Sequence, residues 1–271
     1  MADKPHLNMI VTGHIDNGKS TTMGHFLMDL GVVDERTIAA HGAESEKTGK
    51  GDTFKYAWVM DNIKDERERG ITIDLAFQKF ESAKYFFTLI DAPGHRDFIK
   101  NMITGASEAD AAILVLSAKE GETDTAIAAG GQAREHAFLL KTLGVGQLIV
   151  AINKMDAVEY KEDAFNAAKA KGEGLIKSVG YKLENVAIIP VSGWKGDNLV
   201  KKTENMDWYK GKTLLEAFDD FTVAEKPIGK PLRVPIQDVY TITGVGTVPV
   251  GRVETGIMKA GDKIVVMPSG A

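Results

Sequence analysis

The chain has 271 residues, of which 44% are hydrophobic and 26% charged, and its formal net charge is −5. This length suits one large domain plus part of another, with enough apolar residues for a sizeable core. The sequence contains no cysteine, which excludes disulfides, zinc–thiolate sites and thiol catalysis and fits a reducing, cytoplasmic location. No apolar run approaches the roughly 18–20 residues of a membrane span, and the acidic balance disfavours nucleic-acid binding over the whole surface.

The first predicted elements enclose a glycine-rich turn. Residues 7–12 are an apolar run that predicts a buried strand, and residues 21–30 follow a helical pattern. The turn between them comprises Gly13, His14, Ile15, Asp16, Asn17, Gly18, Lys19 and Ser20, with Thr21 following. Strand, glycine-rich turn and helix in this order are the context of a Walker A phosphate loop, in which backbone N–H groups and the helix N-terminus bind phosphates. Lys19 can then reach the β- and γ-phosphates of a nucleotide, and the Ser20 hydroxyl can bind Mg²⁺.

Residues 33–70 interrupt the alternation of strands and helices. The segment is highly charged and lacks clear periodicity, so we expect a functional excursion that contains helical turns and packs through its aromatic residues. The next two apolar runs, 71–80 and 85–90, are separated only by residues 81–84. Because that connection is too short for a parallel crossover, the two strands should form an antiparallel hairpin.

Strands and helices alternate again in the following part of the chain. The predicted strands are 111–116, 148–152 and 186–191, and the predicted helices are one that ends in 132–140, then 161–178 and 213–221. This order is typical of an α/β fold with a mostly parallel sheet, to which the hairpin adds one antiparallel edge strand.

The composition changes near residue 224. Residues 225–230 combine proline, glycine and charge, as linkers do, and the β-type runs beyond them are 232–239, 246–253 and 263–267. We therefore predict a nucleotide-binding domain over 1–224, a linker over 225–230 and the first part of an all-β barrel over 231–271.

A polar motif follows the second strand of the predicted hairpin. In Asp91-Ala92-Pro93-Gly94-His95, the carboxylate of Asp91 can hold Mg²⁺ directly or through water, because it lies at the C-terminal end of a strand beside the phosphate loop. Gly94 allows the backbone to approach a γ-phosphate closely. Turns use Asp-x-x-Gly frequently, so the position of this motif in the chain carries the interpretation.

Two further motifs follow the last two predicted strands. In Asn153-Lys154-Met155-Asp156, the Asp156 carboxylate can accept hydrogen bonds from the ring N–H and the amino group of guanine, whereas adenine would leave it unpaired. The Lys154 stem can lie along the base plane. In Ser192-Gly193-Trp194, the hydroxyl and a backbone N–H could contact the base O6, although alone this tripeptide would be no better than a turn.

These motifs, together with Arg69-Gly70-Ile71-Thr72-Ile73, resemble in type and order those of the translational GTPases. The runs 54–74, 91–105, 192–194 and 236–256 resemble the elongation factor 1-alpha family, and the archaeal and eukaryotic type more than the bacterial elongation factor Tu because of the long excursion over 33–70. The resemblance covers nearly the whole chain. It implies a GTP-binding and GTP-hydrolysing protein whose cofactors are GTP or GDP and Mg²⁺.

The resemblance also implies roles for single residues. Residues 33–71 would form switch I and residues 91–105 switch II. Thr72 would close over Mg²⁺ and the γ-phosphate, so that Ser20, Thr72 and Asp91 bind the metal, whereas a strand residue would be the ordinary interpretation of this threonine. His95 would position the attacking water, with Lys19 and Thr72 completing the catalytic set and with Ile15 and Ile71 flanking the histidine.

The partners implied by the family are aminoacyl-tRNA, the ribosome and a nucleotide exchange factor, with slow hydrolysis in the absence of the ribosome. The chain departs from the family in two respects. It has Asn17 where a histidine is usual, and it ends inside the predicted barrel. The backbone cradle does not need the side chain at position 17, so nucleotide binding should survive. An incomplete barrel would leave an open edge.

Two alternatives stay open at the level of the sequence. The first is a related regulatory GTPase, such as a release-factor partner or a subunit of a sulfate-activating complex. The second is a non-catalytic fragment that binds nucleotide and self-associates through the open β edge.

Overall fold

The computed structural model describes residues 4–47, 49, 54–61, 64–69, 71–223 and 227–270. The chain divides into two compact units, Met1–Val223 and Ala224–Ala271, which are described separately. The predicted linker begins in residues 225 and 226, which lie outside the described residues. Among the residues that are described, no helix combines the length and the apolar character needed to cross a membrane.

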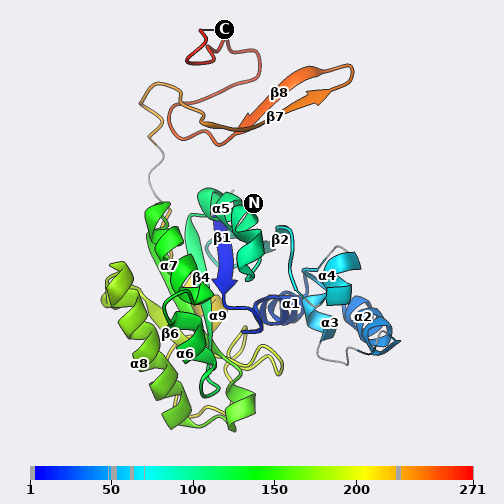
Figure 1. The fold of residues 1–271 in the computed structure, drawn as a ribbon, viewed down its shortest axis with the longest axis vertical. Coiled ribbons are helices and arrows are strands. Elements are labelled where there is room, and N and C mark those ends of the chain that lie inside the picture. Colours follow the sequence, from blue (N-terminus) through cyan, green and yellow to red (C-terminus); the bar gives the residue numbers. More distant parts are fainter. Residues whose placement is uncertain are drawn as a thin grey trace. The chain divides into compact units, whose positions relative to one another are not determined.

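The first unit is built on a six-stranded sheet with the strand order β2-β3-β1-β4-β5-β6 (Figure 1). Its strands are β1 (His6–Gly13), β2 (Ala76–Glu81), β3 (Phe86–Asp91), β4 (Ala111–Ser117), β5 (Gln147–Asn153) and β6 (Ala187–Pro190). All neighbours pair in parallel except β2, which pairs antiparallel with β3 at the edge. The predicted mostly parallel α/β sheet with one antiparallel edge strand is therefore confirmed.

Helices cover both faces of this sheet, which explains why the central strands are continuously apolar. The helices that follow the strands are α1 (Lys19–Asp29), α5 (Ile99–Glu108), α6 (Glu122–Ile127), α7 (Gln132–Thr142), α8 (Glu162–Val179) and α9 (Leu214–Phe218). Side chains alternate along β1, so that Met9 packs in a core with Phe26 of α1 and Phe218 of α9, whereas Ile10 packs with residues of α5, α7 and α8. The predicted helix before residue 140 is two helices, α6 and α7, and the last helix is shorter than predicted.

The described residues of the charged excursion include three helices, which agrees with the helical turns that were predicted there. They are α2 (Glu35–Lys47), α3 (Phe54–Ala57) and α4 (Lys64–Arg69), and they lie together beside α1 (Figure 1). Tyr56 and Trp58 are buried, which confirms that the aromatic residues pack. The backbone of α3 lies directly on α1, because a Cβ atom at Gly24 would come within 1.9 Å of the Tyr56 carbonyl oxygen.

The predicted strand over 71–80 is wrong at its start, because β2 begins only at Ala76. In the residues just before β2, side chains form hydrogen bonds with the backbone groups that a neighbouring strand would otherwise pair with. The Glu66 carboxylate accepts from the backbone N–H groups of Ile73 and Asp74, both at 3.0 Å, and the Asn101 amide of α5 donates to the Ile73 carbonyl at 2.8 Å. Thr72 is therefore carried by an irregular segment that is fixed from two sides.

The second unit contains one antiparallel hairpin, formed by β7 (Ile236–Ile242) and β8 (Gly246–Gly251). The run 263–267, predicted as β-type, is not a strand, and neither are residues 232–235. A strand needs a hydrogen-bonding neighbour, and within the described part of this unit β7 and β8 pair only with each other. That residues 231–271 begin a barrel stays a prediction.

The contact between α1 and α3 gives a test of the fold. Gly24→Ala should lower the free energy of unfolding by about 1–3 kcal/mol, because the added methyl group would push the α3 backbone away from α1. Urea unfolding monitored by circular dichroism measures this change. Gly146→Ala is the matched control, since a Cβ atom there meets nothing within 4 Å. Equal stability of the two variants would contradict the tight α1–α3 contact.

Candidate functional site

The glycine-rich turn between β1 and α1 requires glycine at both ends for steric reasons. Gly13 has φ 146°, and a Cβ atom there would lie 2.4 Å from the Val115 carbonyl oxygen of β4. Gly18 is in the left-handed region with φ 80°, and its Cβ would lie 2.6 Å from the Asn153 amide. The turn therefore fits closely against the C-terminal ends of β4 and β5.

Asn17, the residue that departs from the family pattern, anchors this turn to the sheet. Its side chain is buried and donates to the Val115 carbonyl at 2.9 Å. The Asn17 carbonyl in turn accepts from the Asn153 amide at 2.8 Å. Neither contact uses a backbone N–H group of the turn, although the Ile15 N–H donates to Gln132 Oε1 at 3.2 Å and the Asn17 N–H donates to the His14 carbonyl at 3.4 Å. This geometry supports the prediction that the backbone cradle tolerates asparagine at position 17.

Lys19 enters the site from the first turn of α1. Its side chain is buried, and Nζ donates to the His14 carbonyl at 3.0 Å across the turn. Burial lowers the pKa of Lys19, and the nearby carboxylates of Asp91, Asp16 and Asp61 oppose that effect. A Cβ atom at Gly94 would lie 2.4 Å from Lys19 Nζ, so the backbone after β3 approaches this ammonium group as closely as glycine allows.

Hydroxyl and carboxylate groups gather beside the ammonium group of Lys19. The Ser20 hydroxyl donates to Asp91 Oδ2 at 2.6 Å and lies 3.1 Å from Thr72 Oγ1, which is itself 3.4 Å from Asp61 Oδ1. Burial raises the pKa of Asp91 to about 6 despite its hydrogen bond to Ser20. Burial and the charge of Asp91 together raise the pKa of Asp61 to about 7. Two carboxylates are thus held close together where water is scarce, an arrangement that favours binding of a cation.

His95 lies on the other side of this cluster, in the segment that follows β3. Its ring is partly exposed, and Nδ1 accepts from the Asp97 backbone N–H at 3.2 Å. The Asp97 carboxylate lies 3.5 Å from the same nitrogen. Ile15 and Ile71 line the same cavity as His95, which brings the apolar pair and the histidine together as the resemblance implied.

The motif after β5 forms the opposite end of the site. Asp156 Oδ1 accepts from the Ser192 hydroxyl at 2.6 Å, and Asn153 Oδ1 accepts from the Gly193 N–H at 2.8 Å. The two groups expected to reach the base O6 are therefore engaged within the protein, where they orient Asp156 and Asn153. Lys154 adopts the left-handed conformation with φ 66°, an unusual backbone state for a lysine.

One cavity of about 430 Å³ joins the two ends. Thirteen of the predicted site residues line it: Ile15, Asp16, Gly18, Lys19, Ser20, Thr21, Thr72, Gly94, His95, Asn153, Lys154, Asp156 and Trp194. The other predicted site residues are not among those that line the cavity: Gly13, His14, Asn17, Asp91, Ser192 and Gly193. The sequence did not indicate five lining residues: Phe54, Ala57, Asp61, Lys119 and Ala157. Phe54, Ala57 and Asp61 belong to the aperiodic excursion, where no spacing could have singled them out.

Comparison with known proteins identifies the family of the chain. The family described as "Elongation factor Tu GTP binding domain" matches residues 4–224. The elongation factor 1-alpha of Cenarchaeum symbiosum is 89% identical over 100% of the chain, and that of Desulfurococcus mucosus is 58% identical over 98% of it. The chain spans 62% and 61% of the length of these two relatives.

Among solved structures, Sup35 complexed with GDP is 31% identical, with a TM-score of 0.62 over 100% of this chain and 57% of that chain. The match to Sup35 covers both the unit that contains the phosphate loop and the second unit. The regulatory GTPases considered from the sequence are not favoured, because the curated relatives are named elongation factor 1-alpha. By its sequence match, its fold and the arrangement of its site, the chain belongs to the elongation factor family of GTP-binding proteins, with elongation factor 1-alpha proteins as its relatives.

Proposed function

We propose that the chain binds GTP together with Mg²⁺ and hydrolyses it to GDP and phosphate, and that the full-length protein delivers aminoacyl-tRNA to the ribosome. The observation that carries the proposal is the single cavity that joins a phosphate-binding turn to the Asp156 carboxylate. Its two ends suit the two ends of a guanine nucleotide. The hydroxyl and carboxylate cluster lies on the phosphate side, where a metal ion is needed.

The phosphate end rests on the turn from Gly13 to Ser20. The backbone N–H groups of the turn and the N-terminus of α1 provide partial positive charge, and Lys19 adds a full one. Burial makes the ammonium form of Lys19 costly in the free protein. Phosphate oxygens would restore the favourable interactions that Lys19 loses on burial, which supports this assignment.

The donor set fits Mg²⁺. Ser20 and Thr72 hydroxyl oxygens are 3.1 Å apart, close to the separation of about 3 Å between neighbouring ligands of an octahedral Mg²⁺. Asp91 Oδ1 is buried and has no hydrogen-bond partner among the described residues, so it can receive a metal-bound water. Bound Mg²⁺ would neutralise charge on the phosphates.

His95 has the geometry to orient a water molecule for attack on the γ-phosphate. The Asp97 N–H occupies Nδ1, which leaves Nε2 as the ring nitrogen for that water. Asp156 gives guanine selectivity, because its position is fixed by the Ser192 hydroxyl and its second oxygen can accept from the base. Adenine would leave this carboxylate unpaired.

Delivery of aminoacyl-tRNA is proposed from the elongation factor 1-alpha relatives and from the resemblance of residues 247–256 to the family's second domain. The 89% and 58% identities to proteins named elongation factor 1-alpha support this role. A cytoplasmic location, an exchange factor as partner and self-association through the β7–β8 edge stay predictions.

Guanine selectivity is tested by Asp156→Asn. Labelled GDP should be displaced from the wild-type chain by GDP and GTP but not by ATP. The variant should bind GDP at least about 100-fold more weakly, because it loses the negative charge and places an amide donor where the carboxylate offered an acceptor to the base. Asp163→Asn, an exposed carboxylate on α8, is the control and should bind as wild type does. Displacement by ATP at similar concentrations would contradict the assignment of the base site.

Water positioning is tested by His95→Ala in a single-turnover measurement of GTP hydrolysis with Mg²⁺. The rate should fall by at least about tenfold, because the attacking water loses its oriented partner, whereas GDP affinity should not change. Lys177→Ala, on the exposed face of α8, should hydrolyse at the wild-type rate. An undiminished rate in His95→Ala would remove the role proposed for this side chain.

The metal site is tested by comparing nucleotide affinity in Mg²⁺ with that in EDTA. Ser20→Ala should reduce the gain in affinity on adding Mg²⁺ for both GDP and GTP. Thr72→Ala should reduce it for GTP alone, because this hydroxyl is proposed to close over the γ-phosphate side. If both variants keep the full wild-type gain, the two hydroxyls do not bind the metal.

A further inference from the structure

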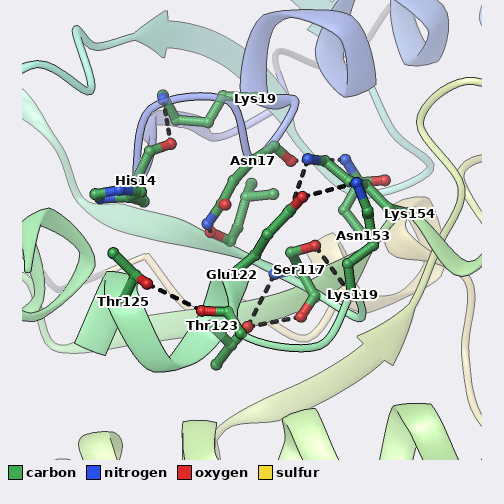
Figure 2. A network of polar contacts seen from close by, with 12 residues as sticks. His14, Asn17, Lys19, Ser117, Lys119, Glu122, Thr123, Thr125, Asn153 and Lys154 are labelled. Carbon is green, nitrogen blue, oxygen red and sulfur yellow. Dashed lines mark hydrogen bonds and ion pairs between the residues drawn. The ribbon is translucent and has the colours of Figure 1, made fainter. Parts of the chain in front are cut away.

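The carboxylate of Glu122, a residue outside the motifs that the sequence indicated, contacts two lysines that line the cavity. Glu122, the first residue of α6, lies 2.7 Å from Lys154 Nζ through Oε2 and 2.9 Å from Lys119 Nζ through Oε1 (Figure 2). Lys154 follows β5 and Lys119 follows the neighbouring strand β4. The carboxylate therefore connects the C-terminal ends of two adjacent strands on the side where the base is proposed to bind.

The three residues differ in their relation to the cavity. Lys119 and Lys154 line it beside Asn153 and Asp156, whereas Glu122 stands behind them. Lys154 has a left-handed backbone, which costs energy in a lysine and is retained only where the surroundings fix it. The contact with Glu122 holds the end of the same side chain. Lys154 is thus constrained at both its backbone and its ammonium group.

Hydrogen bonds fix the turn between β4 and α6 that leads into Glu122. The Thr123 hydroxyl donates to the Ser117 carbonyl at 2.6 Å, and the Ser117 N–H donates to Thr123 Oγ1 at 3.2 Å (Figure 2). The Ala118 N–H donates to the Asn153 carbonyl at 2.8 Å, which ties this turn to β5. Burial alone would raise the pKa of Glu122, but hydrogen bonds from Lys154, Ser117 and Lys119 lower it to about 2, so the carboxylate stays charged.

We propose that Glu122 is a positioning residue that holds the Lys154 side chain in place for the guanine base before the nucleotide arrives, and that it thereby sets how long a guanine nucleotide stays bound. This inference rests on guanine-nucleotide binding in the cavity as proposed above. A lysine stem free to move would have to be ordered on binding, and that ordering would weaken the complex. Because the contact lies at the base end, its loss should affect GDP and GTP equally.

The experiment compares Glu122→Gln with wild type in the whole chain. The glutamine keeps the shape of the side chain and removes its charge. Dissociation of labelled GDP and labelled GTP, followed by stopped-flow fluorescence against excess unlabelled nucleotide, should be about 5–50-fold faster for both. Association should not be slower, because the rim becomes more positive. The loss of two partly exposed ion pairs should lower the thermal unfolding temperature without nucleotide only slightly. Glu120→Gln, an exposed carboxylate in the same turn, is the matched control and should behave as wild type.

A double-mutant cycle shows whether Glu122 acts through Lys154. Lys154→Met should speed dissociation, and adding Glu122→Gln to it should have no further effect. Additive effects would overturn the proposal, since Glu122 would then act on the nucleotide by another route. Wild-type dissociation rates in Glu122→Gln would overturn this inference alone. A wild-type chain that binds no guanine nucleotide would overturn the proposed function together with it.

Discussion

The site depends on how closely the turn after β1 approaches the ends of β4 and β5. Gly13 lies against the Val115 carbonyl, and Gly18 lies against the Asn153 amide, at distances that a side chain on either glycine would prevent. Asn17 and Asn153 then add hydrogen bonds across the same contact. This contact places the phosphate-binding turn next to the motif proposed to bind the base. Segments far apart in sequence thus form one cavity because three strands end at the same edge of the sheet.

Charge balance is the second constraint on the site. Lys19 is buried among carboxylates whose own pKa values are raised, so neither sign of charge is fully compensated in the free protein. A ligand that combines phosphates with a divalent cation supplies both of the missing charges. The same groups also connect the cavity to the charged excursion, since Asp61 belongs to it and Thr72 lies just after it. Glu66 and Asn101 hold the segment after Thr72 from two different helices.

Much of the fold was predictable because its strands are buried on both faces and read as short apolar runs. The motifs at strand ends were predictable because parallel strands bring their C-terminal ends together. Asp61 and Phe54 were not, because they lie in a segment without periodicity and reach the cavity only through tertiary packing. Lys119 and Glu122 were missed because a turn rich in charge resembles any solvated turn. The start of β2 was misjudged because an apolar, β-branched run such as Ile71-Thr72-Ile73 does not reveal that Glu66 takes its hydrogen bonds.

The central claim is that one guanine nucleotide occupies the cavity with its base on Asp156 and its phosphates in the Gly13–Ser20 turn. A crystal structure of the chain with Mg²⁺ and a non-hydrolysable GTP analogue tests this most directly. We expect the base to be hydrogen-bonded to the Asp156 carboxylate, the phosphates to lie between the turn and Lys19, and the metal to bind Ser20 and Thr72. A nucleotide bound elsewhere, or bound in this cavity with its base turned away from Asp156, would contradict it.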